Sequence, residues 1–284
     1  MPSHSMLLTS PELAQALEHA EATHLSRQVA TYVQLSGRDE CRIIAIAGGV
    51  AAVTDAAYGR KLNHVTGLGM GAQLNSKELA ELERTYSTLG LETQVDICPH
   101  AHNSVLAAMA ERNYHVNAYS NTYARYLSPA DVFAAPRDGI EIVTDRAIVE
   151  PIFVEQSMAG FSVQAVSRPV ILLETLARIA VLRTDTRLFA ATYDGIVAGT
   201  AAMSLIETGA GLVAHLYIAS TLPAHRGRGV QLALLNARLA AARGAGCVLA
   251  CVTARPANTS ARNTERAGFG LAYTKSTFVR QRDA

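Results

Sequence analysis

Apolar residues recur at helix and strand spacing along the first half of the chain. Leu13 and Leu17 fall on one face of a helix predicted over residues 11–34, where Ser10 can cap the first turn and Pro11 suits the first position. Short apolar runs separated by glycines, with one amphipathic stretch among them, follow this helix. They predict strands at 41–46, 50–54 and 92–98, a strand that runs into a glycine-rich bend over 63–71, and a helix at 76–89.

The second half has a different order of apolar segments. The Asp194-Gly195 dipeptide lies between two apolar stretches and supplies the positive φ angles of a tight hairpin turn. Helical spacing precedes this hairpin, and a further apolar strand follows it. The pattern predicts a strand at 140–143, helices at 145–159 and 169–182, hairpin strands at 187–193 and 196–205, and a strand at 211–220.

A basic, glycine-rich turn joins that last strand to a helix. The strand ends near Thr221, the turn is Arg-Gly-Arg-Gly at 226–229, and the helix runs from Val230 to Gly244. Glycines permit positive φ angles that turn several backbone N–H groups toward one point, and the first N–H groups of a helix lack internal partners. The helix dipole and two arginines add positive charge, so the turn predicts a binding site for phosphate.

The residues of this turn do not fit two common nucleotide-binding motifs. It lacks the Lys-Ser/Thr ending of a P-loop, which argues against an ATP-dependent phosphotransferase, and it is too compact for the dinucleotide fingerprint. The remaining alternative to a phosphate site is an ordinary strand-to-helix connection with solvated arginines.

The turn resembles the pyrophosphate loop of the GNAT superfamily of N-acetyltransferases, written Q/R-x-x-G-x-G/A. The last position departs from that pattern because Gln231 stands where a small residue is usual, although its amide can donate to a phosphate oxygen. The resemblance implies an α/β fold with a mixed α+β sheet, and acetyl-CoA as the acetyl donor and co-substrate. The loop positions are filled by Arg226, Gly227, Arg228, Gly229, Val230 and Gln231.

The resemblance assigns further cofactor contacts to segments on both sides of the loop. In the family, the strand before the loop pairs with the pantetheine arm through its backbone, a role that falls here to Ala219, Ser220 and Thr221. A polar residue of the short helix after the loop commonly contacts the cofactor, and Ser260 and Asn263 are the candidates. Helix capping or a solvated face is the alternative for these two side chains.

Amine acetylation needs a base or a water path near the acetyl group and a donor for the developing oxyanion. His215 and Tyr217 alternate onto one face of the strand at 211–220, and an unperturbed imidazole titrates near neutral pH. Many family members carry a tyrosine as general acid at the position of Thr264, so Tyr273 is the candidate replacement. The alternative for each of these side chains is packing in the core.

An internal sequence repeat divides the chain into two similar halves. A Glu-Arg pair ends a helix in each half, and equal spacing separates Asn113 from Arg125 and Gly268 from Arg280. Each of these segments is expected to form a strand pair, and the first half lacks the Arg-Gly-Arg-Gly turn. The predicted organisation is two tandem GNAT-like acyl-CoA N-acyltransferase domains, a degenerate one at 1–126 and an acetyl-CoA-binding one at 140–284, joined by a linker at 127–139.

Composition limits the choice of partners. The net charge of +1 gives no argument for nucleic acid or an acidic membrane surface, and 49% hydrophobic residues allow a sizeable core. No apolar run is long enough to span a bilayer and no signal-peptide pattern opens the chain, so we expect a cytoplasmic protein. The four cysteines lie in or beside apolar runs, where buried reduced thiols are expected.

Two other clusters are weaker candidates for sites. The glycines of 67–71 precede a helix without a nearby basic residue, so a bend is favoured over a second phosphate site. Cys98, His100 and His102 alternate, but no fourth ligand is evident nearby, and we expect no metal.

The expected function is transfer of the acetyl group of acetyl-CoA to a primary amine of a small molecule or peptide. A non-catalytic acyl-CoA-binding module or sensor is the alternative, because the usual tyrosine is missing and one half is degenerate. The acceptor amine is not identified by the sequence, since fold resemblance says little about specificity. Either a monomer or a homodimer is compatible with tandem domains.

Overall fold

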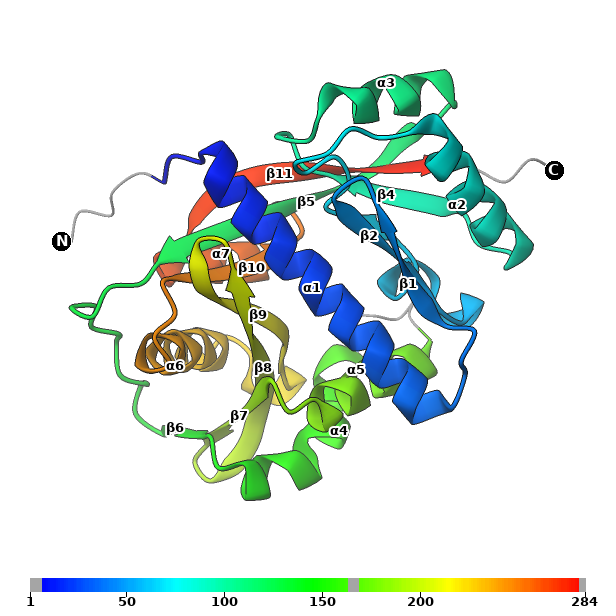
Figure 1. Cartoon of the computed structure of the whole chain (residues 1–284). Helices are drawn as coiled ribbons and strands as arrows, with labels where there is room; N and C mark the ends of the chain where they lie inside the picture. The colour runs from blue at the N-terminus through cyan, green and yellow to red at the C-terminus, as the bar shows by residue number, and fades with distance from the viewer. Residues whose placement is uncertain (1–6, 163–168, 281–284) are drawn as a thin grey trace. The chain divides into compact units, whose positions relative to one another are not determined.

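The computed structural model describes residues 7–162 and 169–280, and its contacts divide the chain into two compact units (Figure 1). We call them the first unit and the second unit. Among the described residues, the first unit comprises 8–122, 254–256 and 271–280, and the second unit comprises 7, 123–162, 169–253 and 257–270.

The first unit is a mixed sheet with helices on both faces. Its helices are α1 (Pro11–Ser36), η1 (Ala56–Lys61), α2 (Ser76–Thr88) and α3 (Asn103–Glu111). Its strands, in sheet order, are β1 (Arg42–Ile46), β2 (Gly49–Val53), β3 (Val65–Thr66), β4 (Thr93–Ile97), β11 (Gly270–Arg280) and β5 (His115–Tyr126). Ala52 of β2 packs against Leu25 and Val29 of α1. Val53, on the opposite face, joins the apolar cluster that includes Leu82 of α2.

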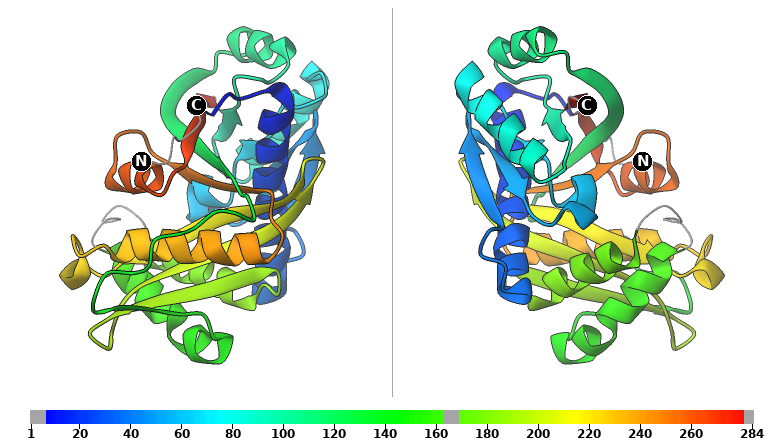
Figure 2. Two further views of the ribbon diagram at one scale, coloured as in Figure 1. Left: turned by 90° about the vertical axis from the view of Figure 1, so that its left-hand side faces the viewer. Right: turned by 90° about the vertical axis from the view of Figure 1, so that its right-hand side faces the viewer.

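The second unit has the same layered construction. Its strands, in sheet order, are β10 (Leu249–Ala254), β9 (Gly211–Thr221), β8 (Ile196–Thr208), β7 (Thr186–Tyr193) and β6 (Ile140–Val143). Its helices are α4 (Arg146–Ser162), α5 (Val170–Leu182), η2 (Pro223–His225), α6 (Val230–Gly244) and α7 (Thr259–Arg266). Ala190 of β7 packs against Phe153 of α4, whereas its neighbour Ala191 pairs with Gly199, whose face is covered by Leu234 of α6. Thus α4 and α6 lie on opposite faces of these strands (Figure 2).

The hairpin predicted in the second half is confirmed. Asp194 has φ +50° and Gly195 has φ +78°, and the flanking residues Tyr193 and Ile196 pair directly. Two consecutive positive φ angles are the backbone geometry of a two-residue turn whose twist matches that of the strands. This hairpin therefore forms where a local sequence signal requires it.

Two strand predictions are wrong, whereas a third segment agrees with its prediction. The segment at 63–71 is the two-residue strand β3 followed by a bend at Gly67, Gly69 and Gly71, which all have positive φ angles. Each segment predicted as a strand pair, after Asn113 and after Gly268, is one long strand, β5 and β11 respectively. Neither strand contains a glycine or a proline after its first residue, so each continues without reversal.

The sequence repeat has a structural counterpart in the short connections that precede β5 and β11. Asn113 and Gly268 both have positive φ angles, +57° and +82°, directly after the short helices α3 and α7. The last strand of the second half, β11, belongs to the first unit, where it pairs antiparallel with β4. The end of β5, from Tyr123, belongs to the second unit. The domain division at 1–126 and 140–284 remains a prediction.

The cysteines and the apolar content of the helices were both the subject of expectations from composition. All four cysteines, Cys41, Cys98, Cys247 and Cys251, are buried and free, as expected from their apolar surroundings. Across residues 7–162 and 169–280, none of the helices combines the length and apolar content needed to cross a membrane.

Candidate functional site

The basic turn of the second unit has an open backbone. Gly227 and Gly229 have φ angles of +77° and +94°, and α6 begins directly after them at Val230. A Cβ atom on Gly227 would meet nothing within 4 Å. Among the described residues, no side chain caps this end of α6. Its first N–H groups are therefore available to an anion, and only glycine readily adopts these φ angles.

Arginine side chains surround this turn. Arg226 donates through Nε to the carbonyl of Thr221 at 3.4 Å and through Nη2 to the carbonyl of Gly160 at 3.3 Å. The Arg228 guanidinium carbon lies 4.6 Å from the centre of the Tyr193 ring, within the range of a cation–π interaction. Across the described part of the chain, neither guanidinium has an ion pair with a carboxylate. The turn is therefore a positively charged surface.

Three of the predicted cofactor residues form one hydrogen-bonded group. Gln231 donates through Nε2 to Ser260 Oγ at 3.2 Å, and Asn263 donates through Nδ2 to Gln231 Oε1 at 2.7 Å. The first turn of α6 is thus tied to α7. The Gln231 amide, which the sequence suggested as a phosphate donor, already uses one of its two N–H groups for Ser260.

Strands β9 and β10 pair over only three positions and then separate. Their parallel register runs from Leu249↔Val213 to Cys251↔His215, although β9 continues to Thr221 and β10 to Ala254. The backbone of β9 beyond His215 therefore has no ladder to β10. An edge of this kind can take an added strand-like ligand through main-chain hydrogen bonds.

A β-bulge changes the direction of β9 beyond His215, where β9 no longer pairs with β10. Between the pairs Ala202↔Tyr217 and Thr200↔Ser220, β9 carries one more residue than β8. Ile218 has φ +44° there, an uncommon conformation for a β-branched residue. Strain of this kind concentrates at functional sites, and no sequence signal marks Ile218. Ile218 is therefore a candidate site residue that the sequence pattern does not indicate.

The predicted pantetheine segment follows the bulge, and α4 covers it. Ser220 is buried, with its hydroxyl 3.5 Å from that of Thr200, whereas Ala219 and Thr221 are half-buried. A Cβ atom on Gly160 would overlap Ser220 Oγ, so α4 approaches β9 closely only because it has a glycine there. Gly160 was not identified from the sequence either, since a lone glycine in a helical pattern has several explanations.

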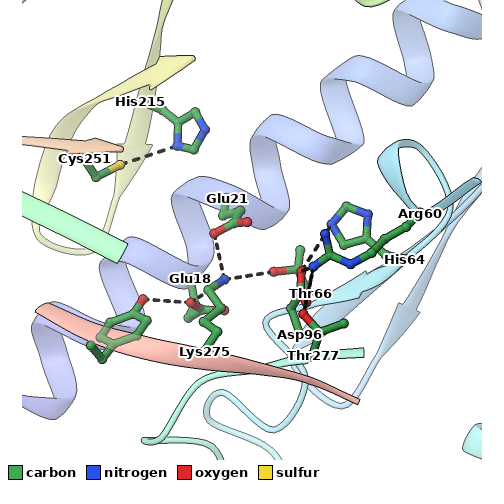
Figure 3. A network of polar contacts seen from close by, with 11 residues as sticks. Glu18, Glu21, Arg60, His64, Thr66, Asp96, His215, Cys251, Lys275 and Thr277 are labelled. Carbon is green, nitrogen blue, oxygen red and sulfur yellow. Dashed lines mark hydrogen bonds and ion pairs between the residues drawn. The ribbon is translucent and has the colours of Figure 1, made fainter. Parts of the chain in front are cut away.

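His215 and Tyr217 lie where β9 and β10 begin to separate. His215 Nδ1 is 3.5 Å from Cys251 Sγ, and both side chains are buried (Figure 3). The Tyr217 hydroxyl is 2.7 Å from Thr186 Oγ1, and burial raises the pKa of that phenol. The centres of the His215 and Tyr217 rings are 6.3 Å apart, so these two predicted catalytic residues lie close together.

Tyr273 has a different environment. It lies on β11 in the first unit, and its hydroxyl donates to Glu18 Oε1 at 2.7 Å. Burial, followed by the charge of Glu18, raises the pKa of Tyr273. A phenol with a raised pKa that already donates to a carboxylate is a weak acid, so this geometry gives its predicted role no support.

The glycine-rich bend of the first unit is closed by its own hydrogen bonds. Gly69 donates to the carbonyl of Ala47 at 2.8 Å, and Met70 donates to that of Gly67 at 3.2 Å. The Gly69 carbonyl accepts from His102 at 2.9 Å. These donors are occupied by protein groups, which agrees with a bend rather than a second phosphate site.

The first unit also contains a buried polar cluster (Figure 3). Ligand atoms of Glu21, His64 and Asp96 lie within 4.8 Å of one another, as a metal site requires. However, Asp96 already accepts both from Arg60 and from Thr277, and Glu21 from Lys275 at 2.7 Å. Two protein cations, Arg60 and Lys275, thus pair with these carboxylates, and we interpret the cluster as an ion-pair network.

Burial in this network lowers the pKa of His64 to about 4, and its Nδ1 has no hydrogen-bond partner among the described residues. An imidazole with a lowered pKa makes the unfolded state bind more protons between pH 6.5 and 4, so stability falls as the pH falls. We expect a loss of about 2 kcal/mol from pH 7 to pH 5 that is absent in His64→Gln. Urea unfolding of both proteins at the two pH values measures this difference. Equal pH dependence in the two proteins would contradict a neutral His64.

Residues 153–269 match the model of the family described as Acetyltransferase (GNAT) family. Among curated proteins, no sequence matches the chain.

Several solved structures share the fold at low sequence identity. A GCN5-related N-acetyltransferase from Kribbella flavida is 15% identical, with a TM-score of 0.63 over 92% of this chain and 96% of its own. One from Sphaerobacter thermophilus is 17% identical, with a TM-score of 0.59 over 99% and 96%. A tandem GNAT protein from the clavulanic acid biosynthesis pathway is 15% identical, with a TM-score of 0.58 over 94% and 98%. The mixed α/β fold of tandem GNAT proteins therefore extends over most of the chain.

Proposed function

We propose that this chain moves the acetyl group of acetyl-CoA to a primary amine, because residues 153–269 match the model of the acetyltransferase (GNAT) family, whose reaction is acyl transfer from acyl-CoA. The acceptor in this proposal is a small molecule or a peptide. The residues proposed to hold the donor are those of 226–231, Ser260, Asn263 and the backbone of 219–221.

The observation that carries the proposal is the separation of β10 from β9, the strand that leads into the 226–229 turn. The two strands stop pairing at Cys251↔His215, and β9 then leads into the open backbone at Gly227 and Gly229. A long ligand with a phosphate at one end and amide groups along its arm matches this order of features. The turn supplies N–H donors and positive charge, and the edge of β9 supplies main-chain partners.

The reaction needs few groups from the protein. A neutral amine attacks the thioester carbonyl, so a C–N bond forms and the C–S bond breaks; the amine loses a proton and the departing thiolate gains one. His215 is proposed as the base that takes the amine proton, directly or through water. The side chain of its neighbour Tyr217 is held in place by a hydrogen bond to Thr186. The excess positive charge at the turn favours the polyanionic end of the donor.

Calorimetric titration with acetyl-CoA, followed by assay of CoA release on a panel of amines, tests the proposal. Micromolar binding, on the order of −8 kcal/mol, together with turnover on at least one amine is the expected result. Binding without turnover on any amine would favour the non-catalytic acyl-CoA-binding module. The absence of binding heat at two temperatures would reject both.

We expect His215→Gln to lower kcat by roughly 100-fold while the KM for acetyl-CoA changes less than threefold, because a base acts in the transition state more than in binding. Steady-state kinetics between pH 6 and 9 measure both constants. His115→Gln, at an exposed position of β5, is the matched control. A variant with unchanged kcat would remove His215 from the proposed mechanism.

A further inference from the structure

We propose that Arg137, a residue of the segment between the two sequence halves, binds a phosphate group of the acyl-CoA donor beside the 226–229 turn. This inference rests on the proposed function. It adds a phosphate-binding residue from outside the glycine-rich motif. Arg137 lies far before Gly229 in the sequence and is not part of that motif.

The Arg137 side chain lies across the start of α6. An ideal Cβ atom on Gly229 would be 3.2 Å from Arg137 Cδ, 3.4 Å from Nε and 3.8 Å from Cζ. The guanidinium is therefore next to the residue that precedes the first helical N–H groups. Gly229 has two functions in this geometry: it adopts the φ angle of the turn, and it leaves room for Arg137.

The segment that carries Arg137 is attached along α6. Near the far end of α6, Arg243 donates to the carbonyl of Asp131, and its guanidinium carbon is 5.4 Å from the centre of the Phe133 ring. Farther along, Asn236 Nδ2 donates to the carbonyl of Ala134 at 3.3 Å. The segment thus follows the helix toward its N-terminus.

A turn then fixes the position of Arg137 itself. Its carbonyl accepts from Ile140 at 3.0 Å, and the Gly139 carbonyl accepts from Asp194 at 2.8 Å. Gly139 has φ +80°, and a Cβ atom there would be 2.6 Å from Asp194 Oδ1. Arg137 is therefore held between the start of β6 and the tip of the β7–β8 hairpin.

The local charge favours an anionic ligand. With Arg226 and Arg228, Arg137 makes three guanidinium groups at the positive end of the α6 dipole, where cations are unfavourable. In the part of the chain that the structure describes, none of the three has an ion pair with a carboxylate. A phosphate removes this repulsion, and a guanidinium fork matches its oxygens.

Acyl-CoA carries two kinds of phosphate, the pyrophosphate and the 3′-phosphate of the ribose, and the same chemistry recognises both. Titration of acetyl-CoA and of 3′-dephospho-acetyl-CoA separates them. We expect Arg137→Gln to weaken acetyl-CoA binding about tenfold and to reduce the salt dependence of the affinity. If the difference between the variant and the unaltered protein disappears with the dephospho compound, Arg137 binds the 3′-phosphate. If the difference persists, Arg137 binds the pyrophosphate. Both results support the proposal.

Two variants make the test specific. Arg178→Gln removes another exposed arginine of the second unit, on α5, and should leave the affinity within twofold. Arg137→Lys keeps the charge but not the fork, so its affinity should lie between those of the unaltered protein and Arg137→Gln. Thermal unfolding of each variant establishes that the fold is retained.

The outcomes separate this inference from the proposed function. If the unaltered protein binds acetyl-CoA and Arg137→Gln stays within twofold of it, only the role of Arg137 is overturned. The same holds if Arg178→Gln weakens binding as much as Arg137→Gln does. If the unaltered protein does not bind acetyl-CoA, the proposed function fails and this inference fails with it.

The attachment along α6 gives an independent readout. Asn236→Ala should weaken acetyl-CoA binding two- to threefold by loosening the segment, and it should have no further effect in an Arg137→Gln background. Such non-additivity identifies Asn236 as a positioning residue that acts through Arg137. Fully additive losses in the double variant would contradict that arrangement.

Discussion

Acetyl-CoA binding should fall roughly 100-fold or more in Gly229→Glu. The residue has φ +94°, a conformation that side-chain-bearing residues rarely adopt, and its Cβ position is 3.2 Å from Arg137 Cδ. The introduced carboxylate would also pair with the arginines of the turn and occupy the place of the phosphate. Steric, conformational and electrostatic effects therefore act in the same direction. Calorimetric titration with acetyl-CoA measures the loss.

Gly246→Glu is the matched control for this variant. Gly246 has φ +82° just after the other end of α6, and a Cβ atom there would meet nothing within 4 Å. The backbone strain and the charge change are therefore the same in kind, but the substitution is remote from the turn. It should lower the stability by about 1–2 kcal/mol and leave the affinity unchanged. An affinity in Gly229→Glu within threefold of that in Gly246→Glu would show that the turn does not bind the donor.

The largest loss of stability should come from Lys275→Met, at about 3–5 kcal/mol. Lys275 is 0% exposed, and its Nζ lies 2.7 Å from carboxylate oxygens of both Glu18 and Glu21. Burial disfavours its charged form, but Glu18 and Glu21 outweigh that effect and raise the pKa of Lys275. Removal of the ammonium leaves Glu18, also 0% exposed, without its cation. Urea unfolding followed by circular dichroism gives the change in the free energy of unfolding.

Two comparisons assign that loss to the ion pair. Lys77→Met removes an exposed lysine of α2 and should change the stability by less than about 0.5 kcal/mol. The double variant Glu18→Gln, Lys275→Met should lose less than the sum of its single variants, because the uncompensated carboxylate is removed along with the ammonium. A loss in Lys275→Met no larger than that in Lys77→Met would mean that the buried pair does not stabilise the first unit.

The sequence by itself determined the features that depend on neighbouring residues. The Asp194-Gly195 turn, the cap of α1 at Ser10 and the start of α6 after Gly229 follow from backbone preferences within a few positions. The prediction that the 226–229 turn binds an anion has the same basis, because glycines, arginines and a helix start adjoin one another in the chain. For this reason the order of the elements in the second half was predicted closely, and the family with it.

Only the tertiary structure decided the features that depend on distant residues. Glu18 and Tyr273 are 255 positions apart, yet they share a hydrogen bond, and Arg137 meets Gly229 only because its segment is attached along α6. The separation of β9 from β10 and the positive φ of Ile218 depend on sheet register. Register, burial and the choice of ion partners depend on the sum of contacts across the fold, and no window of the sequence contains that sum. The sequence therefore determined the residues of the 226–229 turn, and the fold determined which distant side chains lie beside it.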